Sequence, residues 1–387
     1  MKRRKLIRFL VVVLVLIGCA AVGAIAFERS RNPDRLLRLG RDAIGREDWD
    51  RADECADRLI ANEHRDYGRL LRGESLYKQH RPESAFEMLN RVRGDALRIE
   101  AARTQGMCLL ELGSQREAER IFFYILREQP DDLVALRGLA AIAYDQGNWL
   151  HAETYLHKLV ELAPDDGRPI WTLGQINHDL GLHTQSEQYF RDALTRTLPG
   201  DLAGQVRADL AMSLNEQKRF TEALEELDRA KLSIVSPKHE RIRIDCLRST
   251  GQLAEAIAQA DAYLARRPND AGLLAEKGLA LVDAKRPADA VDVLEQALSM
   301  MPHDRRGRDG LRAAYQALGR TADAAIQKDK RDESDRLYKA LNELTHEAMD
   351  KPWDASVRWK MAETCVQLEM PELAAMWRTA ARACEGK

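Results

Sequence analysis

The sequence has no closely spaced pair of cysteines. Its six cysteines are Cys19, Cys55, Cys108, Cys246, Cys365 and Cys384. The closest two are 19 residues apart. Zinc sites and disulfide frameworks use short, repeated cysteine spacings, so neither is expected. We expect Cys55, Cys108, Cys246 and Cys365 to be small buried thiols between helices.

Motifs that carry catalysis are also absent. The chain has no phosphate-binding glycine loop, no HExxH helix and no Gly-x-Ser-x-Gly elbow. His151 and His157 are six residues apart and would lie on different faces of a helix, while His178 and His183 flank Gly181. We therefore expect a protein that is not an enzyme and has no cofactor and no metal.

Basic charge is not in excess. Lys and Arg number 60 against 62 acidic residues. Five of these cations precede Phe9, which leaves 55 basic and 62 acidic residues in the rest of the chain. A phosphate backbone needs a basic field, so nucleic acid is not an expected partner.

The N-terminus has the pattern of an export or anchoring signal. Residues 1–8 are cationic, and residues 9–27 are uncharged and mostly apolar. As a helix this segment would span about 28 Å, close to the thickness of a bilayer core. Three outcomes remain open: an uncleaved transmembrane anchor, a cleaved signal at Ala24-Ile25-Ala26, or lipidation of Cys19, because Leu16-Ile17-Gly18-Cys19 resembles a bacterial lipobox. The full apolar length favours the anchor.

Orientation rests on the charges that flank this segment. Arg29, Arg31, Arg35, Arg38 and Arg41 nearly balance the five N-terminal cations. A dense cluster next to the first segment usually stays in the cytoplasm. We expect a single-pass protein of the bacterial inner membrane with its folded part outside the cytoplasm.

The rest of the chain is repetitive. Gly113, Gly147 and Gly181 recur every 34 residues, and so do Ala118, Ala152 and Ser186. Within one period, Leu136, Leu139, Ala140 and Ala143 form the stripe of an amphipathic helix, which Gly147 ends. A second stripe follows, and Pro164 ends it. Each period therefore predicts two antiparallel helices, and the pairs Ser114–Glu117 and Thr184–Glu187 predict capping boxes at second-helix starts.

These residues resemble the tetratricopeptide repeat (TPR) family, whose pattern has a small residue in the first helix, alanine in the second, and proline near the end. The resemblance implies an all-α, tandem helix-turn-helix superhelical solenoid, preceded here by a single transmembrane helix. We place units one to five at 33–200, a loop at 201–203, units six to nine at 204–338, a helical extension at 339–354 and a terminal unit at 355–387.

Two features fall outside the regular pattern. Residues 320–351 contain neither Gly nor Pro and predict one long helix with Leu337, Leu341, Leu344 and Ala348 as its buried edge. Trp353, Trp359 and Trp377 are concentrated near the C-terminus, where we expect them to seal the open end of the stack.

The resemblance also implies where a partner would bind, because in this family the first helices line a concave surface. The corresponding positions in units three to five are Arg103, Met107, Arg137, Tyr144, Asp145, Trp171, Gln175, His178 and Asp179. Cations, carboxylates and an aromatic ring suit proteins or extended peptides as partners. We expect a membrane-anchored scaffold for protein–protein interactions at the cell envelope. The alternative is an accessory subunit of an envelope polysaccharide export or cell-wall synthesis machine that contacts glycan through the concave face.

Overall fold

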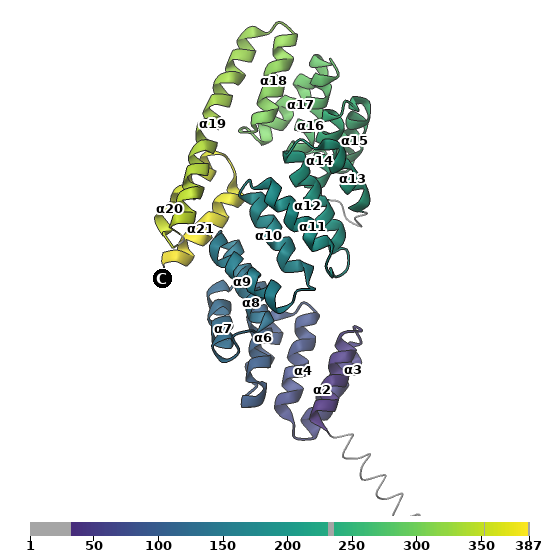
Figure 1. Cartoon of the computed structure of the whole chain (residues 1–387), viewed down its shortest axis with the longest axis vertical. Helices are drawn as coiled ribbons and strands as arrows, with labels where there is room; N and C mark the ends of the chain where they lie inside the picture. Colours follow the sequence, from purple (N-terminus) through teal and green to yellow (C-terminus); the bar gives the residue numbers. More distant parts are fainter. Residues whose placement is uncertain (1–31, 231–235, 352, 386–387) are drawn as a thin grey trace, which may run out of the picture. The chain divides into compact units, whose positions relative to one another are not determined.

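The protein is a tandem array of helices. The computed structural model describes residues 32–230, 236–351 and 353–385, which contain α-helices α2 to α21 and one short 3-10 helix (Figure 1). The chain divides into two compact units, here called unit 1 (up to Leu139) and unit 2 (from Ala140). The boundary falls within helix α8.

The helices follow one another with short turns between them. Unit 1 contains α2 (Pro33–Ile44), α3 (Trp49–Ala61), α4 (Arg65–Lys78), α5 (Pro82–Leu89), the 3-10 helix η1 (Asp95–Leu97), α6 (Arg98–Glu111), α7 (Gln115–Glu128) and the first part of α8 (Leu133–Asp145). Unit 2 continues with α9 (Trp149–Leu162), α10 (Gly167–Asp179), α11 (His183–Leu194), α12 (Leu202–Glu216), α13 (Phe220–Ala230), α14 (Pro237–Ser249), α15 (Leu253–Arg266), α16 (Ala271–Asp283), α17 (Pro287–Met300), α18 (Arg305–Ala317), α19 (Thr321–Asp350), α20 (Ala355–Gln367) and α21 (Pro371–Glu385).

Consecutive helices pack as hairpins, and first helices of neighbouring hairpins also pack on one another, as α2 does on α4 and α12 on α14. The small residue of the first helix permits the close packing of the two helices within a hairpin. A Cβ at Gly106 would lie 2.5 Å from Cε1 of Phe122, and one at Gly174 would lie 2.5 Å from Cε1 of Phe190. Within the described chain this gives an all-helical repeat solenoid, as the sequence predicts.

The buried thiols are also as predicted, whereas the capping boxes are not. Cys55, Cys108, Cys246 and Cys365 are free and buried. Ser114 is the N-cap of α7 but makes no side-chain capping hydrogen bond, and α11 begins at His183, which places Thr184 inside the helix. Glu187 instead accepts hydrogen bonds from Arg219 of the next hairpin at 2.7 Å.

The predicted loop at 201–203 differs from the structure, because α12 already begins at Leu202. The connection from α11 is held in place by two backbone hydrogen bonds, from Thr197 to Asp165 (2.8 Å) and from Gly167 to Thr197 (3.0 Å). One hydrophobic core runs past it, from Ile170 in α10 to Cys246 in α14. The connection is therefore packed, and the division into two compact units falls at Leu139 rather than here.

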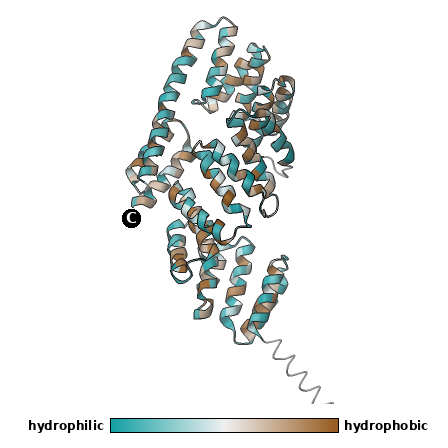
Figure 2. Ribbon diagram, viewed as in Figure 1, coloured by the Kyte–Doolittle hydropathy of each residue, from teal (hydrophilic) through white to brown (hydrophobic). Residues whose placement is uncertain are grey.

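Helix α19 is 30 residues long, and its two halves are stabilised differently. Its first half is charged and pairs with α18, through Arg331 to Asp309 (3.1 Å) and Arg305 to Asp335 (3.3 Å). Its second half packs with α20 and α21 through an apolar edge that consists of Leu337, Leu341, Leu344 and Ala348. Figure 2 shows this long helix with hydrophilic residues over much of its surface.

The C-terminal helix α21 covers the turn between α8 and α9, within unit 2. Trp377 is only 6% exposed, and a Cβ added to Gly147 would lie 2.6 Å from Cζ3 of its ring. The rings of Trp353 and His151 also meet, with centroids 4.9 Å apart. We call these two pairs the closure contact.

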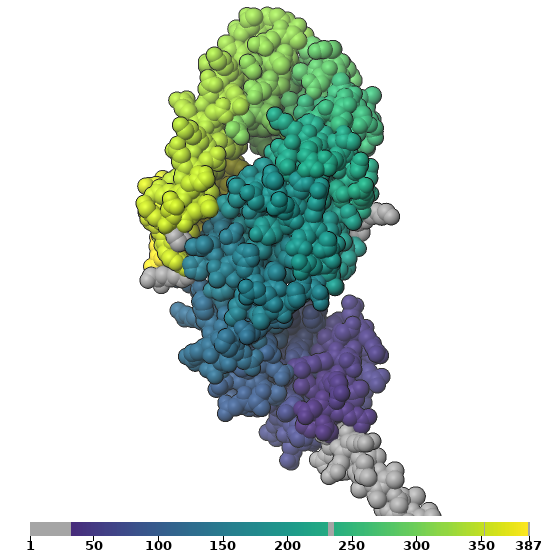
Figure 3. Space-filling model, viewed as in Figure 1, coloured from purple at the N-terminus to yellow at the C-terminus, as the bar shows by residue number. Residues whose placement is uncertain are grey.

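Three other turns of unit 2 that contain glycine lack such a cover within the described residues. A Cβ at Gly181, Gly251 or Gly319 would meet no atom of the described chain within 4 Å. The residues that flank Gly147, by contrast, are buried: Gln146 is 7% and Asn148 is 3% exposed. Figure 3 shows a gap in unit 2, with the yellow-green C-terminal part on one side and the teal helices on the other.

The predicted membrane segment at 9–27, with Cys19, lies outside the described residues. None of the described helices is both long and apolar enough to cross a membrane.

Candidate protein-interaction surface

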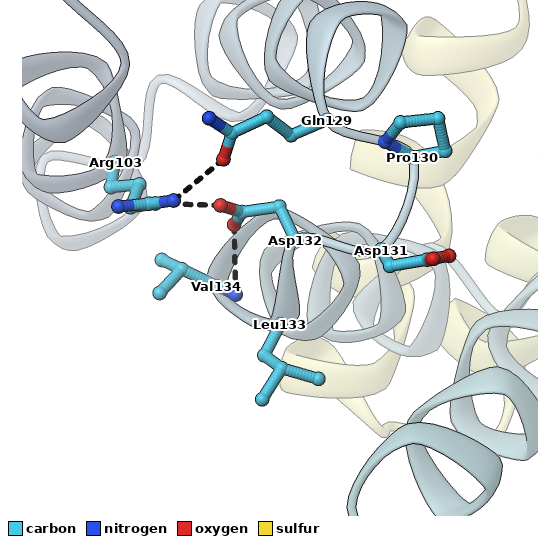
Figure 4. Close-up of a pocket in the computed structure, with 7 residues that line it drawn as sticks. All are labelled: Arg103, Gln129, Pro130, Asp131, Asp132, Leu133 and Val134. Carbon is cyan, nitrogen blue, oxygen red and sulfur yellow. Dashed lines mark hydrogen bonds and ion pairs between the residues drawn. The ribbon is translucent and has the colours of Figure 1, made fainter.

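In unit 1, Arg103 connects two successive repeats. It lies on α6 and pairs through Nε with Asp132 (2.6 Å), and its Nη2 donates to Gln129 (2.8 Å) (Figure 4). Asp132 also caps α8, because it accepts hydrogen bonds from the backbone of Val134 and Ala135. Arg103 therefore stabilises the entry into α8, at the wall of an open cavity of about 570 Å³.

The two other candidates of unit 1 are half-buried. Met107 lies on α6, one turn after Arg103, and Arg137 lies on α8. The remaining six candidates belong to unit 2, so the two sets are described separately.

In unit 2, the candidate residues form hydrogen bonds from one first helix to the next. The hydroxyl of Tyr144 on α8 donates to Asp179 on α10 (3.0 Å). Trp171 on α10 donates through Nε1 to Asp209 on α12 (2.8 Å). Gln175 lies 3.5 Å from the same carboxylate oxygen. These bonds fix the aromatic side chains within the surface.

The aromatic candidates are consequently half-buried. Trp171 packs against the hydrophobic core that includes Phe190 and Val206, and the ring of Tyr144 meets that of Trp149 edge-on, with centroids 5.5 Å apart. Burial and the adjacent Asp179 carboxylate raise the pKa of the Tyr144 hydroxyl. Asp145 and Asp179 are the exposed members of the predicted set.

His178 lies where the predicted surface meets a cavity further along unit 2. A hydrogen bond joins its Nδ1 to Oγ of Ser213 on α12 (3.1 Å). Burial, Lys238 and His183 together lower the pKa of His178 to about 4. Its imidazole is therefore neutral at pH 7.

The cavity has a volume of about 260 Å³ and is bounded by five successive first helices, α10, α12, α14, α16 and α18, with the turn before α18. Its lining residues are His178, Met212, Asn215, Glu216, Lys238, Arg241, Ile242, Asp245, Gly272, Ala275, Glu276, Met301, Asp304 and Arg306. We call this the α14 cavity. Of the predicted site residues, only His178 lines it.

Two buried carboxylates lie in its wall. Asp245 accepts hydrogen bonds from Arg306 (2.6 Å) and Arg248 (2.7 Å), and Arg306 also pairs with Glu276 (3.0 Å). Burial opposes ionisation of Asp245, but the two guanidinium groups outweigh it and lower its pKa. Burial raises the pKa of Glu276, and the nearby Asp245 adds to the increase.

The sequence prediction missed this cavity because it assigned groove positions only in the third to fifth repeats, which end at residue 200. Three extra residues separate Gly181 from the equivalent turn at Lys218, whose φ of 62° is also positive. Counted back from Lys218, the same positions lead to Met212, Asn215 and Glu216, and counted back from Gly251 they lead to Arg241 and Asp245, all of which line the cavity. The repeat pattern does not lead to Lys238, which lies one turn before these positions.

Among the described residues, no three side chains of His, Cys, Asp or Glu are grouped so that they would hold a metal ion. The surface offers hydrogen-bonding, charged and aliphatic side chains.

Comparison with known proteins identifies the repeats. Residues 37–98, 138–202 and 243–305 match the family model of the tetratricopeptide repeat. The chain thus contains tetratricopeptide repeats in both units. No curated protein matches the sequence.

Solved structures with similar helical arrangements have low sequence identity to the chain. YrrB, described as a TPR protein with an unusual peptide-binding site, is 19% identical, with 48% of this chain and 95% of YrrB covered and a TM-score of 0.41. A tetratricopeptide repeat protein from Parabacteroides merdae is 16% identical, with 64% and 98% covered and a TM-score of 0.45. For pilF of Pseudomonas aeruginosa the identity is 16%, the coverage 55% and 95%, and the TM-score 0.48.

Proposed function

Because three stretches of the chain carry tetratricopeptide repeats, we propose that it is a membrane-anchored scaffold that mediates protein–protein interactions at the cell envelope. The observation that carries this proposal is the α14 cavity, which opens on five consecutive first helices and combines charged groups with the aliphatic side chains of Met212, Ile242 and Met301. Such a surface suits an extended segment of a protein partner. In this proposal the chain acts by binding and has no catalytic activity.

The anchor is the apolar segment 9–27, with the folded part outside the cytoplasm. Its support is the length of the apolar run and the cationic cluster at residues 1–8. A C-terminal fusion to a reporter that needs disulfides to fold should be active. A reporter that is active only in its cytoplasmic form would reverse the orientation. Fatty-acid labelling of the wild type that disappears in Cys19→Ala would assign lipidation.

The partner surface can be tested with a photoreactive amino acid in the full chain in cells. We expect protein adducts from position 216, because Glu216 is exposed and lines the α14 cavity. Position 255 is a matched control, because Glu255 is also exposed but lies on the second helix α15. Equal adducts from both positions would contradict binding at the first helices.

The glycan alternative depends on stacking of sugar rings on Trp171 and Tyr144. Both rings are half-buried, and both polar groups are hydrogen-bonded within the chain. These observations favour a protein partner. Glycan adducts from position 216, in place of protein adducts, would support the alternative.

A further inference from the structure

The charged groups of the α14 cavity fall into two classes, those that are hydrogen-bonded to a partner within the chain and those that are not. The carboxylates of Asp245 and Glu276 are buried and paired with arginines, as described above. Asp304 accepts a hydrogen bond from the backbone of Gly307 (3.0 Å) and so caps α18. The negative charge of these residues is therefore compensated within the protein.

Two cations on α14 are available. Lys238 and Arg241 are three residues apart, which places them on one face of the helix. Lys238 is exposed, and its charge acts on the Asp179 carboxylate, although no ion pair joins the two side chains in the described part of the chain. For Arg241 the nearest carboxylate oxygen belongs to Asp270, at 4.0 Å, a distance too long for a hydrogen bond.

The position of the Arg241 guanidinium depends on a glycine in the next first helix. Gly272 is the second residue of α16, and the guanidinium of Arg241 lies where the Cβ of any larger residue would stand. The charge is thus held against the cavity wall, beside Ala275. By contrast, both terminal nitrogens of Arg306 are occupied by Asp245 and Glu276.

The surroundings define which anion fits. Glu216 lines the same cavity and is exposed, and Asp179 lies on the preceding first helix. These acids would repel a polyanion, and so the cavity favours a ligand segment with a single carboxylate. Ile242 and Met301 provide apolar contact for the residues beside that carboxylate, over the buried Met212.

We propose that Lys238 and Arg241 form a subsite of the α14 cavity that binds the carboxylate side chain of an Asp or Glu within an extended, otherwise apolar segment of a protein partner. The inference rests on the proposed function, because it names the chemistry of the segment that the first helices bind. Arg241 provides a planar pair of N–H donors, and Lys238 provides a second charge one turn away.

The test uses an array of short extended peptides in which each sequence with one Glu is matched by the same sequence with Gln. The full chain is applied at low and high salt. We expect Glu peptides to bind about tenfold more tightly than their Gln partners, with the difference reduced at high salt. Lys238→Met/Arg241→Met should remove this preference. Arg243→Met is the matched control on the same helix, because Arg243 pairs with Asp228 of α13 (2.6 Å) and does not line the cavity.

The outcomes separate the two levels of the proposal. Peptides that bind with no difference between Glu and Gln, or a double variant that keeps the preference, would overturn the carboxylate subsite and leave the scaffold function intact. An array in which no peptide binds would contradict peptide binding itself, and the subsite with it. Circular dichroism and thermal unfolding of each variant check that it is folded.

Discussion

At the scale of single residues, the small position of the first helix is set by what lies opposite it. Gly106 is in the middle of α6, where alanine would normally increase helix stability by about 1 kcal/mol. Here its Cβ would lie 2.5 Å from the rigid ring of Phe122. We therefore expect Gly106→Ala to reduce the free energy of unfolding by about 1–3 kcal/mol, measured by urea denaturation.

Gly45 is the matched control in the same unit. It has a right-handed φ of −65° at the end of α2, and an added Cβ would make only ordinary contacts at 3.6 Å. Gly45→Ala should leave stability unchanged or increase it by up to about 1 kcal/mol. The same sign for both substitutions would show that helix propensity, and not the Phe122 ring, determines the effect.

His178 should make stability depend on pH. Its pKa of about 4 in the folded state lies below the ordinary value of 6.5, so the unfolded chain binds a proton first as the pH falls. The stability that its neutral form contributes is present above pH 6.5 and is lost between pH 6.5 and 4. We expect His178→Gln to reduce this loss by about 1–3 kcal/mol in unfolding measurements across that range. Identical pH profiles for both proteins would contradict the assignment.

At the scale of helices, much of the structure follows from the sequence for local reasons. Gly147 and Gly181 end first helices because they have positive φ values of 64° and 74°. The same turn occurs at Lys218, Lys285 and Glu369, where no glycine marks it. There the repeat spacing predicts the turn and the residue type does not. The capping box predicted for Thr184 and Glu187 was wrong because Glu187 forms an ion pair with Arg219, in the turn between α12 and α13, in preference to its own helix terminus.

The candidate site was predicted only in part, since the hydrogen bonds that connect successive first helices are not periodic. Trp171 occupies a groove position, but the hydrogen bond from its Nε1 to Asp209 holds its ring in a half-buried position. Asp209 lies on α12, in the repeat that follows the three extra residues. A repeat pattern does not indicate which side chains of α12 face α10.

The two halves of α19 should respond differently to salt. Ion pairs with α18, including Arg331 to Asp309, hold the first half, and these are partly exposed and screened by salt. Apolar contacts of Leu341 and Ala348 hold the second half. Between about 0.05 and 1 M NaCl, we expect amide hydrogen exchange to accelerate over residues 327–336 and to stay constant or slow over 341–348. A uniform response along the helix would contradict this division.

At the scale of the whole molecule, the closure contact is the feature that sequence periodicity did not predict. Trp377 was expected to seal the end of the stack, and in the structure it covers Gly147, 230 residues earlier in the chain. A repeat pattern predicts contacts between neighbouring repeats, because each repeat packs on the next one. It contains no information about contacts between distant repeats.

A pair of glycine substitutions tests this contact. Gly147→Ala and Gly181→Ala both place a side chain at positive φ and so have a similar backbone cost of about 1–2 kcal/mol. Only Gly147→Ala also displaces Trp377. We expect faster amide exchange in α21 for Gly147→Ala alone, accompanied by a larger radius of gyration of the chain in X-ray scattering. Equal effects of both substitutions on α21 would contradict the contact.

The closure contact also changes how unit 2 should lose its structure. A linear array frays from its two ends, because each terminal repeat has a neighbour on one side only. In unit 2 the last repeat covers the first turn, so the last repeat and this turn each gain a packing partner. We therefore expect less fraying at both places. Removal of residues 353–387 should therefore accelerate amide exchange around Gly147, although that turn is more than 200 residues from the deletion. In this molecule, a lesion at the C-terminus would be detected at two separate places, in the adjacent second half of α19 and around Gly147.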